Sequence, residues 1–374
     1  MKLFEFQAKD AFRQCGIPVP SGVLVESQEE VSNALQDICP PCVIKAQVLQ
    51  GGRGKAGLVK LVKTNDEARE YTRFLFEEKG VRRVLVEAAV DFKDELYLAI
   101  TVDSAKSKAV ILACAEGGVD IELLAATAPE KIITQMVDLD QGLSGFHLRN
   151  TAFGLGLVGD RAKAFNKILS SLYQAFRKFD AELIEINPLF LTDGEVFLAG
   201  DGKLIIDDNS MSRQPGYEVT RDHYEHEVEY QAALAGIPYL QFDGDISLMC
   251  AGAGLTTTVF DLINYAGGTV ANYLEFGGPN YTRAVDAMEL CLKNTRAKVI
   301  LIVTFGTVAR ADVIAKGLAD AVARFKPSIP IVTCIRGTNE EEAFEIIRSL
   351  GLTPLSETEE AVQRAVDIAA GRTS

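Results

Sequence analysis

No run of about 18 apolar residues occurs in this 374-residue chain, so we expect no transmembrane helix. No apolar stretch follows the first six residues, so we expect no signal peptide. The seven cysteines lack the paired spacing of a disulfide framework or a zinc site, which favours reduced thiols in a cytoplasm. These absences together predict a cytoplasmic protein without a membrane partner.

Positive charge is also scarce. The chain has 38 Lys and Arg residues against 52 Asp and Glu residues, and its net charge is −14. A balance of this sign argues against nucleic acid and against anionic membranes as partners. An anionic substrate would need local positive charge, and one short stretch supplies it with Lys45, Arg53, Lys55, Lys60 and Lys63.

Histidine is rare as well, with three in the chain. None of them lies in a glycine-rich loop, so Ser-His-Asp catalysis finds no candidate. His223 and His226 have helical spacing, but no third metal ligand lies nearby in the sequence. We therefore expect them on the solvated face of a bridging helix, and we find no obvious nucleophile in this chain.

The order of the elements predicts two domains of different class. Residues 1–230 combine neighbouring strands with few helices, which is typical of an α+β domain. From residue 236 onward strands and helices alternate, which is typical of an α/β domain with a parallel sheet. We expect domains at 1–230 and 231–374. The predicted strands are 22–25, 43–46, 84–87, 96–103, 109–113, 246–250, 299–304 and 329–335, and the clearest predicted helices are 161–179, 255–265 and 340–349.

The most informative segment is a predicted hairpin. Apolar strands flank Asp193-Gly194, a dipeptide that favours a tight turn. Asn187 and Asp201 each lie seven residues from Gly194, so folding about the turn sets them opposite one another, about 5 Å apart at Cβ. An amide oxygen and a carboxylate at that separation can hold Mg²⁺, which takes few protein ligands and fills its shell with water and phosphate.

Glu185 lies two residues before Asn187 and therefore points to the same face of the strand. With this carboxylate, we interpret the hairpin as a metal platform for a nucleoside triphosphate. A surface hairpin with a solvated aspartate is the alternative, and the hairpin taken alone does not separate the two.

A glycine-rich loop at residues 50–57 (QGGRGKAG) follows a predicted strand that ends near Lys45. Glycines let backbone N–H groups approach phosphate oxygens, and Arg53 and Lys55 add positive charge. The spacing is not that of a Walker A loop. We interpret the loop as a phosphate-binding element, with a mobile basic hairpin as the alternative.

Residues 87–90 form a predicted hinge between two strands. Such a hinge can present backbone amide and carbonyl groups to a purine, and the nearby Glu95 carboxylate can accept hydrogen bonds from ribose hydroxyls. The alternative is that Glu87 is merely solvated at the end of its strand.

Two glycine turns in the second domain, at Gly252 and Gly306, each follow a predicted strand and open a predicted helix. The free N–H groups and the dipole of a helix N-terminus favour an anion. Ligands of parallel sheets bind at these carboxyl ends of the strands. The turns could serve a phosphate, a carboxylate or neither.

Taken in order, these motifs resemble the β-subunit of succinyl-CoA synthetase, an acid–thiol ligase of the ATP-grasp type. The resemblance implies an N-terminal ATP-grasp domain and a C-terminal flavodoxin-like CoA-ligase domain. It also implies phosphoryl transfer from ATP to a histidine of an α-subunit, then an acyl phosphate, then attack by the CoA thiol. The matching segments are residues 2–9, 45–57, 95–98, 116–122 and 183–189.

The resemblance further implies roles for the matching positions. Glu185 would be catalytic and face the α-subunit's phosphohistidine, and the helix that opens at Gly252 would point its N-terminus at it. This chain would bind Mg²⁺ and ATP or ADP, with GTP as an alternative, whereas CoA would bind mainly to the α-subunit. The nucleotide contacts would come from Lys45, Gly52, Arg53, Gly54, Glu87, Val90 and Glu95, and the metal ligands would be Asn187 and Asp201.

The part that would bind the acid departs from the family pattern. Ala251 stands where the family usually has asparagine, and Pro279 stands where it has glycine. The family's Gly-Ile-Val is replaced by Thr307, Val308 and Ala309. A hydroxylated or larger acid could use the Thr307 hydroxyl. Sequence drift in a distant lineage is the alternative.

The sequence therefore predicts the β-subunit of an acid–CoA ligase, with succinate as the first expected small carboxylic acid. Malate, citrate or another carboxylate is the alternative within this class. An ATP-grasp carboxylate–amine ligase would need its whole active site in one chain, and the parallel-sheet domain argues against it. A regulatory subunit without turnover is disfavoured by the intact Lys45, Asn187 and Asp201.

Overall fold

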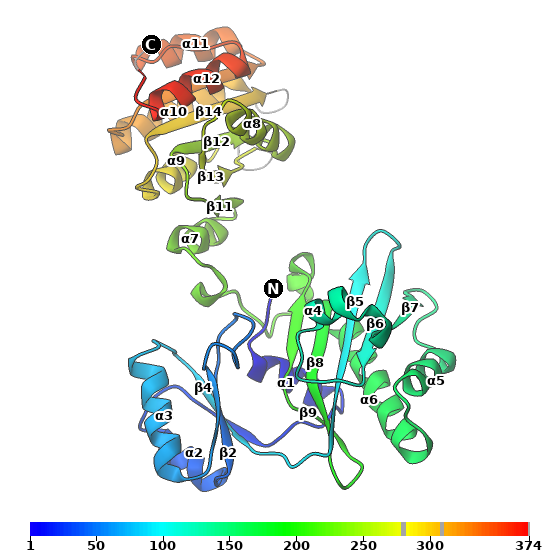
Figure 1. The fold of residues 1–374 in the computed structure, drawn as a ribbon. Helices are drawn as coiled ribbons and strands as arrows, with labels where there is room; N and C mark the ends of the chain where they lie inside the picture. The colour runs from blue at the N-terminus through cyan, green and yellow to red at the C-terminus, as the bar shows by residue number, and fades with distance from the viewer. Residues whose placement is uncertain (278–281, 307–309, 373–374) are drawn as a thin grey trace. The chain divides into compact units, whose positions relative to one another are not determined.

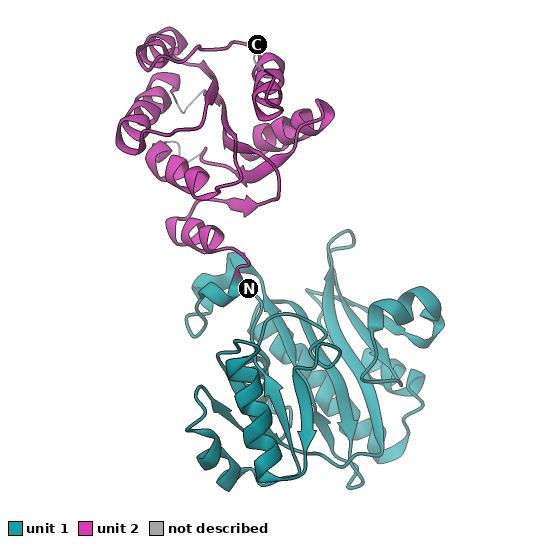
Figure 2. Ribbon diagram, turned by 60° about the vertical axis from the view of Figure 1, so that its left-hand side comes forward, with its two compact units in different colours: residues 1–223 teal, residues 224–374 magenta. Residues whose placement is uncertain are grey.

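The structure is a computed structural model that describes residues 1–277, 282–306 and 310–372. The chain divides into two compact units, Met1–His223 and Tyr224–Ser374 (Figure 2). The boundary between the units falls between residues 223 and 224, whereas the sequence led us to expect it between residues 230 and 231. Each unit has its own hydrophobic core.

The first sheet of unit 1 is antiparallel, with the strand order β1-β4-β2-β3. Helices α2 and α3 cover one of its faces (Figure 1) and share a core with it that includes Ile44, Leu75 and Val86. The elements are β1 (Gly22–Val25), α2 (Val31–Asp37), β2 (Cys42–Ala46), β3 (Val59–Val62), α3 (Asn65–Glu77) and β4 (Val84–Ala88).

The second sheet of unit 1 is also antiparallel, with the order β10-β8-β5-β6-β7 and β9 paired with β8. The expected long helix is confirmed as α6, whose apolar stripe, including Leu169, Leu172 and Phe176, is buried against this sheet. The elements are α1 (Glu5–Gln14), β5 (Asp94–Asp103), β6 (Lys108–Cys114), α4 (Ile121–Thr127), β7 (Ile133–Asp138), α5 (Gly145–Gly154), α6 (Gly159–Lys178), β8 (Ala181–Leu191), β9 (Phe197–Ala199) and β10 (Lys203–Ile206).

The polar stretch after β10 forms the short 3-10 helices η2 (Asp208–Arg213) and η3 (Arg221–His223). The expectation that His223 and His226 share a helix face is wrong. His223 ends η3, and His226 is the N-cap residue of the next helix, where its backbone N–H donates to the Glu229 carboxylate. The three-residue spacing therefore spans a helix start rather than a turn of one helix.

Unit 2 contains one sheet with the order β11-β13-β12-β14-β15, parallel except for β11, so the predicted α/β class is confirmed. Helices α8 and α12 share a core on one face, and α7, α9, α10 and α11 share a core on the other. The elements are α7 (Glu227–Ala235), β11 (Tyr239–Gln241), β12 (Ile246–Ala251), α8 (Ala253–Tyr265), β13 (Val270–Leu274), α9 (Ala284–Lys293), β14 (Val299–Gly306), α10 (Ala311–Phe325), β15 (Ile331–Gly337), α11 (Glu340–Ser349) and α12 (Thr358–Ala369). Across the described residues, no helix has both the length and the apolar composition that crossing a bilayer requires.

Candidate active site

A cavity of about 860 Å³ lies in unit 1 and is lined by residues of both of its sheets. This volume is in the range of small-molecule and cofactor sites. Of the unit 1 residues predicted to bind the nucleotide or the metal or to be catalytic, all except Glu95 contribute to its wall. The predicted residues in the wall are Lys45, Gly52, Arg53, Gly54, Glu87, Val90, Glu185, Asn187 and Asp201.

The hairpin has the register that the turn predicted. Strand β9 pairs with β8 at Leu189 and Ala199, and β10 pairs with β8 at Lys203 and Glu185. Both pairings belong to the same antiparallel register, and in that register Asn187 lies opposite Asp201. Both side chains line the cavity.

Both hairpin side chains have partners within the chain. The Asn187 amide accepts a hydrogen bond from the Gly118 N–H at 2.8 Å and donates one to the Val119 carbonyl at 3.0 Å. The Asp201 carboxylate is held by Arg53, whose Nη2 donates to its two oxygens at 2.7 and 2.8 Å. An incoming cation would therefore exchange with contacts that already exist.

The donor set suits a hard cation that takes few ligands from protein. Among the residues that the structure describes, no group of three or more His, Cys, Asp and Glu side chains gathers as a metal site. Asn187 and Asp201 supply two oxygens, and Mg²⁺ binds commonly through one or two carboxylates together with substrate phosphates and water. The residues present therefore fit a metal that arrives with a polyphosphate.

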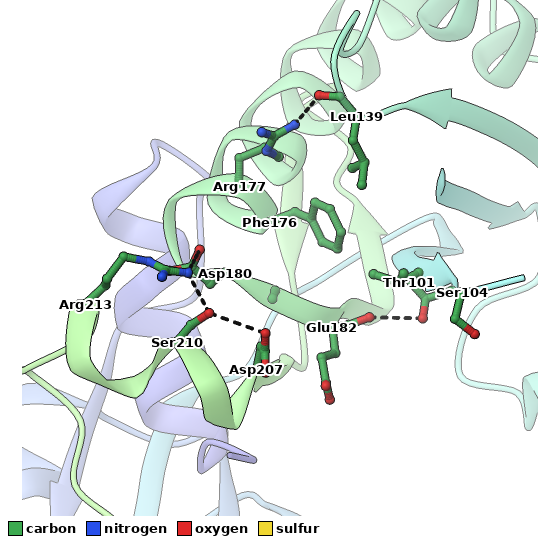
Figure 3. A pocket seen from close by; sticks show the side chains of 12 residues that line it. Thr101, Ser104, Leu139, Phe176, Arg177, Asp180, Glu182, Asp207, Ser210 and Arg213 are labelled. Atoms are coloured by element: carbon green, nitrogen blue, oxygen red, sulfur yellow. Dashed lines mark hydrogen bonds and ion pairs between the residues drawn. The ribbon is translucent and has the colours of Figure 1, made fainter. Parts of the chain in front are cut away.

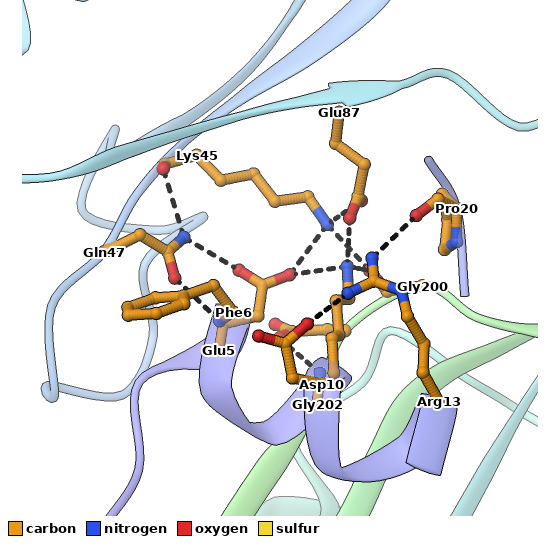
Figure 4. A network of polar contacts seen from close by, with 12 residues as sticks. Glu5, Phe6, Asp10, Arg13, Pro20, Lys45, Gln47, Glu87, Gly200 and Gly202 are labelled. Carbon is orange, nitrogen blue, oxygen red and sulfur yellow. Dashed lines mark hydrogen bonds and ion pairs between the residues drawn. The ribbon is translucent and has the colours of Figure 1, made fainter. Parts of the chain in front are cut away.

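A buried network of charges forms one wall of the cavity (Figure 4). Glu5 and Glu87, which are 3% and 2% exposed, alternate with the ammonium groups of Lys9 and Lys45. Lys45 lies 3.0 Å from Glu5 and 2.6 Å from Glu87, and Lys9 lies 2.8 Å from Glu5 and pairs with Glu87. Both ammonium groups also donate to the Gly200 carbonyl, at 2.8 and 2.7 Å, so the network fixes the turn that carries Asp201.

Electrostatics keep Glu5 and Lys45 ionised in this network. Burial alone would raise the pKa of the Glu5 carboxyl, but Lys9, Lys45 and Arg53 outweigh burial and hold that pKa well below its usual value. Burial alone would lower the pKa of Lys45, but Glu5 and Glu87 outweigh it and raise that pKa. The cavity wall therefore keeps a fixed ammonium group at Lys45, the type of group that holds phosphate oxygens.

The glycine-rich loop connects β2 to β3 at the rim of the cavity. A Cβ added at Gly51, Gly52 or Gly54 would meet no atom within 4 Å, and Gly52 has a φ of +71°, which favours glycine. Arg53 reaches from this loop to Glu5 at 2.5 Å and to Asp201, and Lys55 pairs with Asp120 at 3.2 Å. The loop thus places cations and open backbone over the metal-binding candidates.

Of the two residues expected beside the base and the ribose, one lines the cavity and the other does not. Val90 lines the cavity, whereas Glu95 is not among the described residues that line it. A Cβ at Gly118 would lie 3.1 Å from Glu95 Oε1, so this carboxylate lies against the 118–120 loop. The alternative that Glu87 is solvated is wrong, because Glu87 is buried and pairs with Lys9 and Lys45.

An apolar wall completes the cavity. Phe92 and Phe190 stack with ring centroids 4.3 Å apart, and both line the cavity together with Val43, Leu61 and Val90. A flat apolar ring, such as a nucleobase, matches a wall of this composition.

Glu185 lies on β8 beside Asn187, facing the cavity. Burial raises the pKa of its carboxyl, and Lys203, whose Nζ lies 3.9 Å away, only partly offsets that effect. A half-buried carboxylate with a raised pKa at the edge of a cavity is a candidate for holding or orienting a proton-bearing group.

Sequence reasoning missed two kinds of residue at this site. No role was predicted for Glu5 and Lys9, although both are buried on α1 together with Ala8 and Phe12. Charges four residues apart on an apolar face are the signal that could have identified them. The 118–120 loop had no assigned chemistry, yet it lines the cavity and bonds to Asn187.

The three histidines have structural contacts. His147 is buried, with Nδ1 at Ser144 and Nε2 at the Met136 carbonyl. His223 contacts Thr220 and the Lys2 carbonyl, and His226 caps α7. None of the three lines the cavity.

A second cavity of about 570 Å³ lies at the start of β8 (Figure 3). Its arginines are already engaged, because Arg213 pairs with Asp180 at 2.9 Å and Arg177 donates to the Leu139 carbonyl at 2.6 Å. None of the residues predicted for the site lines it.

In unit 2, Ala251 ends β12 at the carboxyl edge of the parallel sheet. Gly252, with a φ of +97°, follows it and is the N-cap residue of α8. A Cβ at Gly277 would lie 2.4 Å from the Gly252 nitrogen, so only glycine fits this close approach. The remaining predicted acid-site positions, Thr307, Val308 and Ala309, and the altered Pro279 lie outside the described residues.

Two protein families match this chain. Residues 2–191 match the family described as ATP-grasp domain, and residues 249–368 match the family described as CoA-ligase. The chain is also similar, over 99% of both lengths, to the solved structure of ATP citrate lyase from Methanothrix soehngenii in complex with citrate and coenzyme A, with a TM-score of 0.77. At 21% identity this likeness shows the fold alone.

Relatives of known name match over nearly the whole chain. The ADP-forming sulfoacetate-CoA ligase subunit SauC of Bilophila wadsworthia is 62% identical and covers 100% of both chains. Subunit SqwK of the same kind of ligase from Acholeplasma sp. is 53% identical, covering 99% of this chain and 92% of its own length. The ADP-forming succinate–CoA ligase subunit β of Ignicoccus hospitalis is 41% identical and covers 99% of each chain.

Proposed function

This chain belongs to the family of ADP-forming acid–CoA ligase subunits, and we propose that it is the nucleotide-binding subunit of a ligase that joins sulfoacetate to CoA. As in that family, an ATP-grasp domain precedes a CoA-ligase domain. The observation that carries the nucleotide half is the cavity in which Lys45, Arg53, Asn187 and Asp201 converge. The identity of the acid rests on the two relatives named as sulfoacetate-CoA ligase subunits, which are more similar to this chain than the named succinate–CoA ligase subunits.

The cavity supplies what a nucleoside triphosphate needs. Lys45 and Arg53 would neutralise phosphate oxygens, and the backbone of Gly52 and Gly54 is open enough to donate to them. Asn187 and Asp201 would hold Mg²⁺, which neutralises charge on the phosphates when bound. The stacked Phe92 and Phe190 and the nearby Val90 would cover the base, which ATP, ADP or GTP would present.

Glu185 is the residue that we propose to act next to the transferred phosphoryl group. Its carboxylate faces the cavity on the same side of β8 as Asn187, and its raised pKa suits contact with an imidazole N–H. Such a contact would orient the histidine ring that receives the phosphoryl group.

That histidine would belong to a partner, the α-subunit, which would also hold most of the CoA. All three histidines of this chain have contacts within the chain, and none of them lines the cavity. The relatives are themselves named as subunits. The active enzyme would therefore be a hetero-oligomer.

The acid-binding part would lie in unit 2, at the carboxyl edge where Ala251 and Gly252 meet. Alanine at position 251 leaves more room than the asparagine that the family usually has. A sulfonate is bulkier than a carboxylate, so added room at this point favours an acid that carries one.

The test is a panel of acids with the co-expressed partner, CoA and either ATP or GTP, in which ADP or GDP formation is measured. Sulfoacetate should give the highest kcat/KM, ahead of succinate, malate, citrate and acetate. A preference for succinate would overturn the proposed acid. If no acid leads to formation of ADP or GDP, the proposed ligase activity is overturned.

An independent arm uses the Asp201→Ala variant. It should fold normally and fail to phosphorylate the partner's histidine from ATP. Full phosphorylation by this variant would contradict the proposed metal site.

A further inference from the structure

Thr304 is a buried residue without a satisfied hydroxyl. It lies on β14, is 0% exposed, and its Oγ1 finds no hydrogen-bond partner in the part of the chain that the structure describes. Buried polar side chains almost always have partners, because an unpaired buried hydroxyl costs free energy. An exception of this kind calls for a physical reason.

The position of Thr304 supplies one. In the parallel pairing of β12 with β14, Thr304 lies opposite Ala251, the last residue of β12. The alternation along β14 puts Thr304 on the same face as Ile300 and Ile302, and Ala251 packs on that face as well. The two side chains are therefore neighbours near the carboxyl edge of the sheet, where β12 and β14 run side by side (Figure 1).

This edge is where ligands of parallel sheets bind. Gly252 follows Ala251 and is the N-cap residue of the 13-residue helix α8, whose N-terminal N–H groups favour an anion. Ala251, the neighbour of Thr304 on β12, has only a methyl side chain and cannot accept a hydrogen bond from the Thr304 hydroxyl.

We propose that the Thr304 hydroxyl donates a hydrogen bond to an oxygen of the acid substrate and is a specificity-determining residue for a sulfonate. This inference rests on the proposed function. The sulfonate has three acceptor oxygens in a tetrahedral arrangement, whereas a carboxylate has two in a plane. A third oxygen that reaches past the Ala251 methyl group would give the Thr304 hydroxyl its missing partner.

The charges around the edge make such a donor important. The carboxylate of Glu275 lies at the same turn, since a Cβ at Gly277 would come 3.0 Å from Glu275 Oε1 and 2.4 Å from the Gly252 nitrogen. An anion at this edge meets that negative charge. The N-terminus of α8 and the Thr304 hydroxyl are the groups that would offset it.

The test compares three variants in the complex with the partner subunit. Thr304→Val keeps the shape and removes the hydroxyl, and Thr304→Ser keeps the hydroxyl. Thr333→Val is the matched control, because Thr333 is buried on the neighbouring β15 and its hydroxyl already donates to the Thr353 carbonyl. Each variant is measured with sulfoacetate, succinate and ATP, and each is unfolded in urea.

Thr304→Val should lower kcat/KM for sulfoacetate by about 10- to 100-fold, the loss expected for one hydrogen bond to a charged group. The KM for ATP should not change. The urea midpoint of the same variant should rise, because the unpaired hydroxyl is gone. Thr304→Ser should retain the sulfoacetate activity, and Thr333→Val should keep the acid profile while its urea midpoint falls.

The failures of the two proposals are distinguishable. If wild type prefers succinate, the proposed acid fails, whatever the variants do. If wild type prefers sulfoacetate and Thr304→Val has the same acid profile with a raised urea midpoint, the hydroxyl is only tolerated in the core and the inference is overturned.

Discussion

Arg53 holds the carboxylate of Asp201 by both of its oxygens, at 2.7 and 2.8 Å. The arginine side chain is 10% exposed and also bonds to Glu5. Burial alone would lower the pKa of the Arg53 guanidinium, but Asp201 and Glu5 outweigh burial and raise that pKa, so the cation is permanent. A metal that uses Asp201 therefore competes with Arg53, and a phosphate that attracts Arg53 removes the competitor.

We expect Arg53→Met to bind Mn²⁺ more tightly than wild type when no nucleotide is present. The gain should be about tenfold, or roughly 1.4 kcal/mol, because a competing cation has been removed. The same variant should bind ADP more weakly, since it lacks a phosphate ligand. Free Mn²⁺ is measured by electron paramagnetic resonance, with and without ADP.

Lys55→Met is the control for this experiment, because Lys55 belongs to the same loop but is 80% exposed and pairs with Asp120. It should leave Mn²⁺ binding unchanged. An Arg53→Met variant with the Mn²⁺ affinity of wild type would show that the Arg53–Asp201 pair does not oppose the metal.

Lys9→Met should destabilise unit 1 strongly. Lys9 is 1% exposed and neutralises Glu5 and Glu87, so its removal leaves buried carboxylates short of one counter-charge. Breaking a buried ion pair in this way costs about 3–5 kcal/mol. The free energy of unfolding is measured in urea, with Lys163→Met as the control.

Lys163 also forms an ion pair, with Asp160, but its side chain is 76% exposed. Its replacement should leave the urea midpoint almost unchanged. Equal effects at the two lysines would refute the buried network as a source of stability.

Glu185→Gln should become more stable than wild type as the pH rises. Because burial raises the pKa of this carboxyl in the folded state, the unfolded chain loses the proton first, and ionisation opposes folding. Wild type therefore loses stability from about pH 4.5 up to the raised pKa, whereas the glutamine variant has no such loss.

The measurement for Glu185 is the free energy of unfolding of both proteins from pH 4 to pH 8. The difference between them should grow through the lower part of this range and then stay constant. It should amount to about 1.4 kcal/mol for each unit by which the pKa is raised. A difference that is independent of pH would contradict the assigned direction.

Gly117→Ala should disturb the 118–120 loop. A Cβ at Gly117 would lie 2.7 Å from the Leu96 carbonyl oxygen and 2.8 Å from the Leu96 nitrogen, which are backbone atoms that cannot move aside cheaply. The resulting shift should cost about 1–3 kcal/mol and loosen the bonds from Gly118 and Val119 to Asn187. Thermal unfolding and ADP affinity are measured.

Gly51→Ala is the matched control, since a Cβ at Gly51 meets no atom within 4 Å. This variant should unfold at the wild-type temperature. A Gly117→Ala protein that is as stable as wild type and binds ADP equally well would show that the loop adapts without cost.

The relation between Asn187 and Asp201 was predictable because it is local. The turn at Asp193-Gly194 and the alternation of β8 fix which residues face each other, and the pairing of Lys203 with Glu185 keeps that register. The strand and helix periods of both units were predictable for the same reason, since each depends on residues close in sequence.

The buried network was not predictable in that way. Glu5, Lys45 and Glu87 come from different elements, and only the packing of α1 against both sheets buries their charges together. Glu95 was expected at the ribose pocket from its sequence neighbours, and its position also depends on packing, because its carboxylate lies against Gly118 and is not part of the cavity wall. Contacts between distant segments decide both cases.

The account depends most on the claim that Asn187 and Asp201 hold the metal of a bound nucleotide. A crystal structure of the chain with its partner, ADP and Mn²⁺, analysed by anomalous scattering, tests it directly. We predict one anomalous peak about 2 Å from Asn187 Oδ1 and from the Asp201 carboxylate, with Arg53 turned to the phosphates. ADP in another cavity, or a metal away from both side chains, would contradict the account.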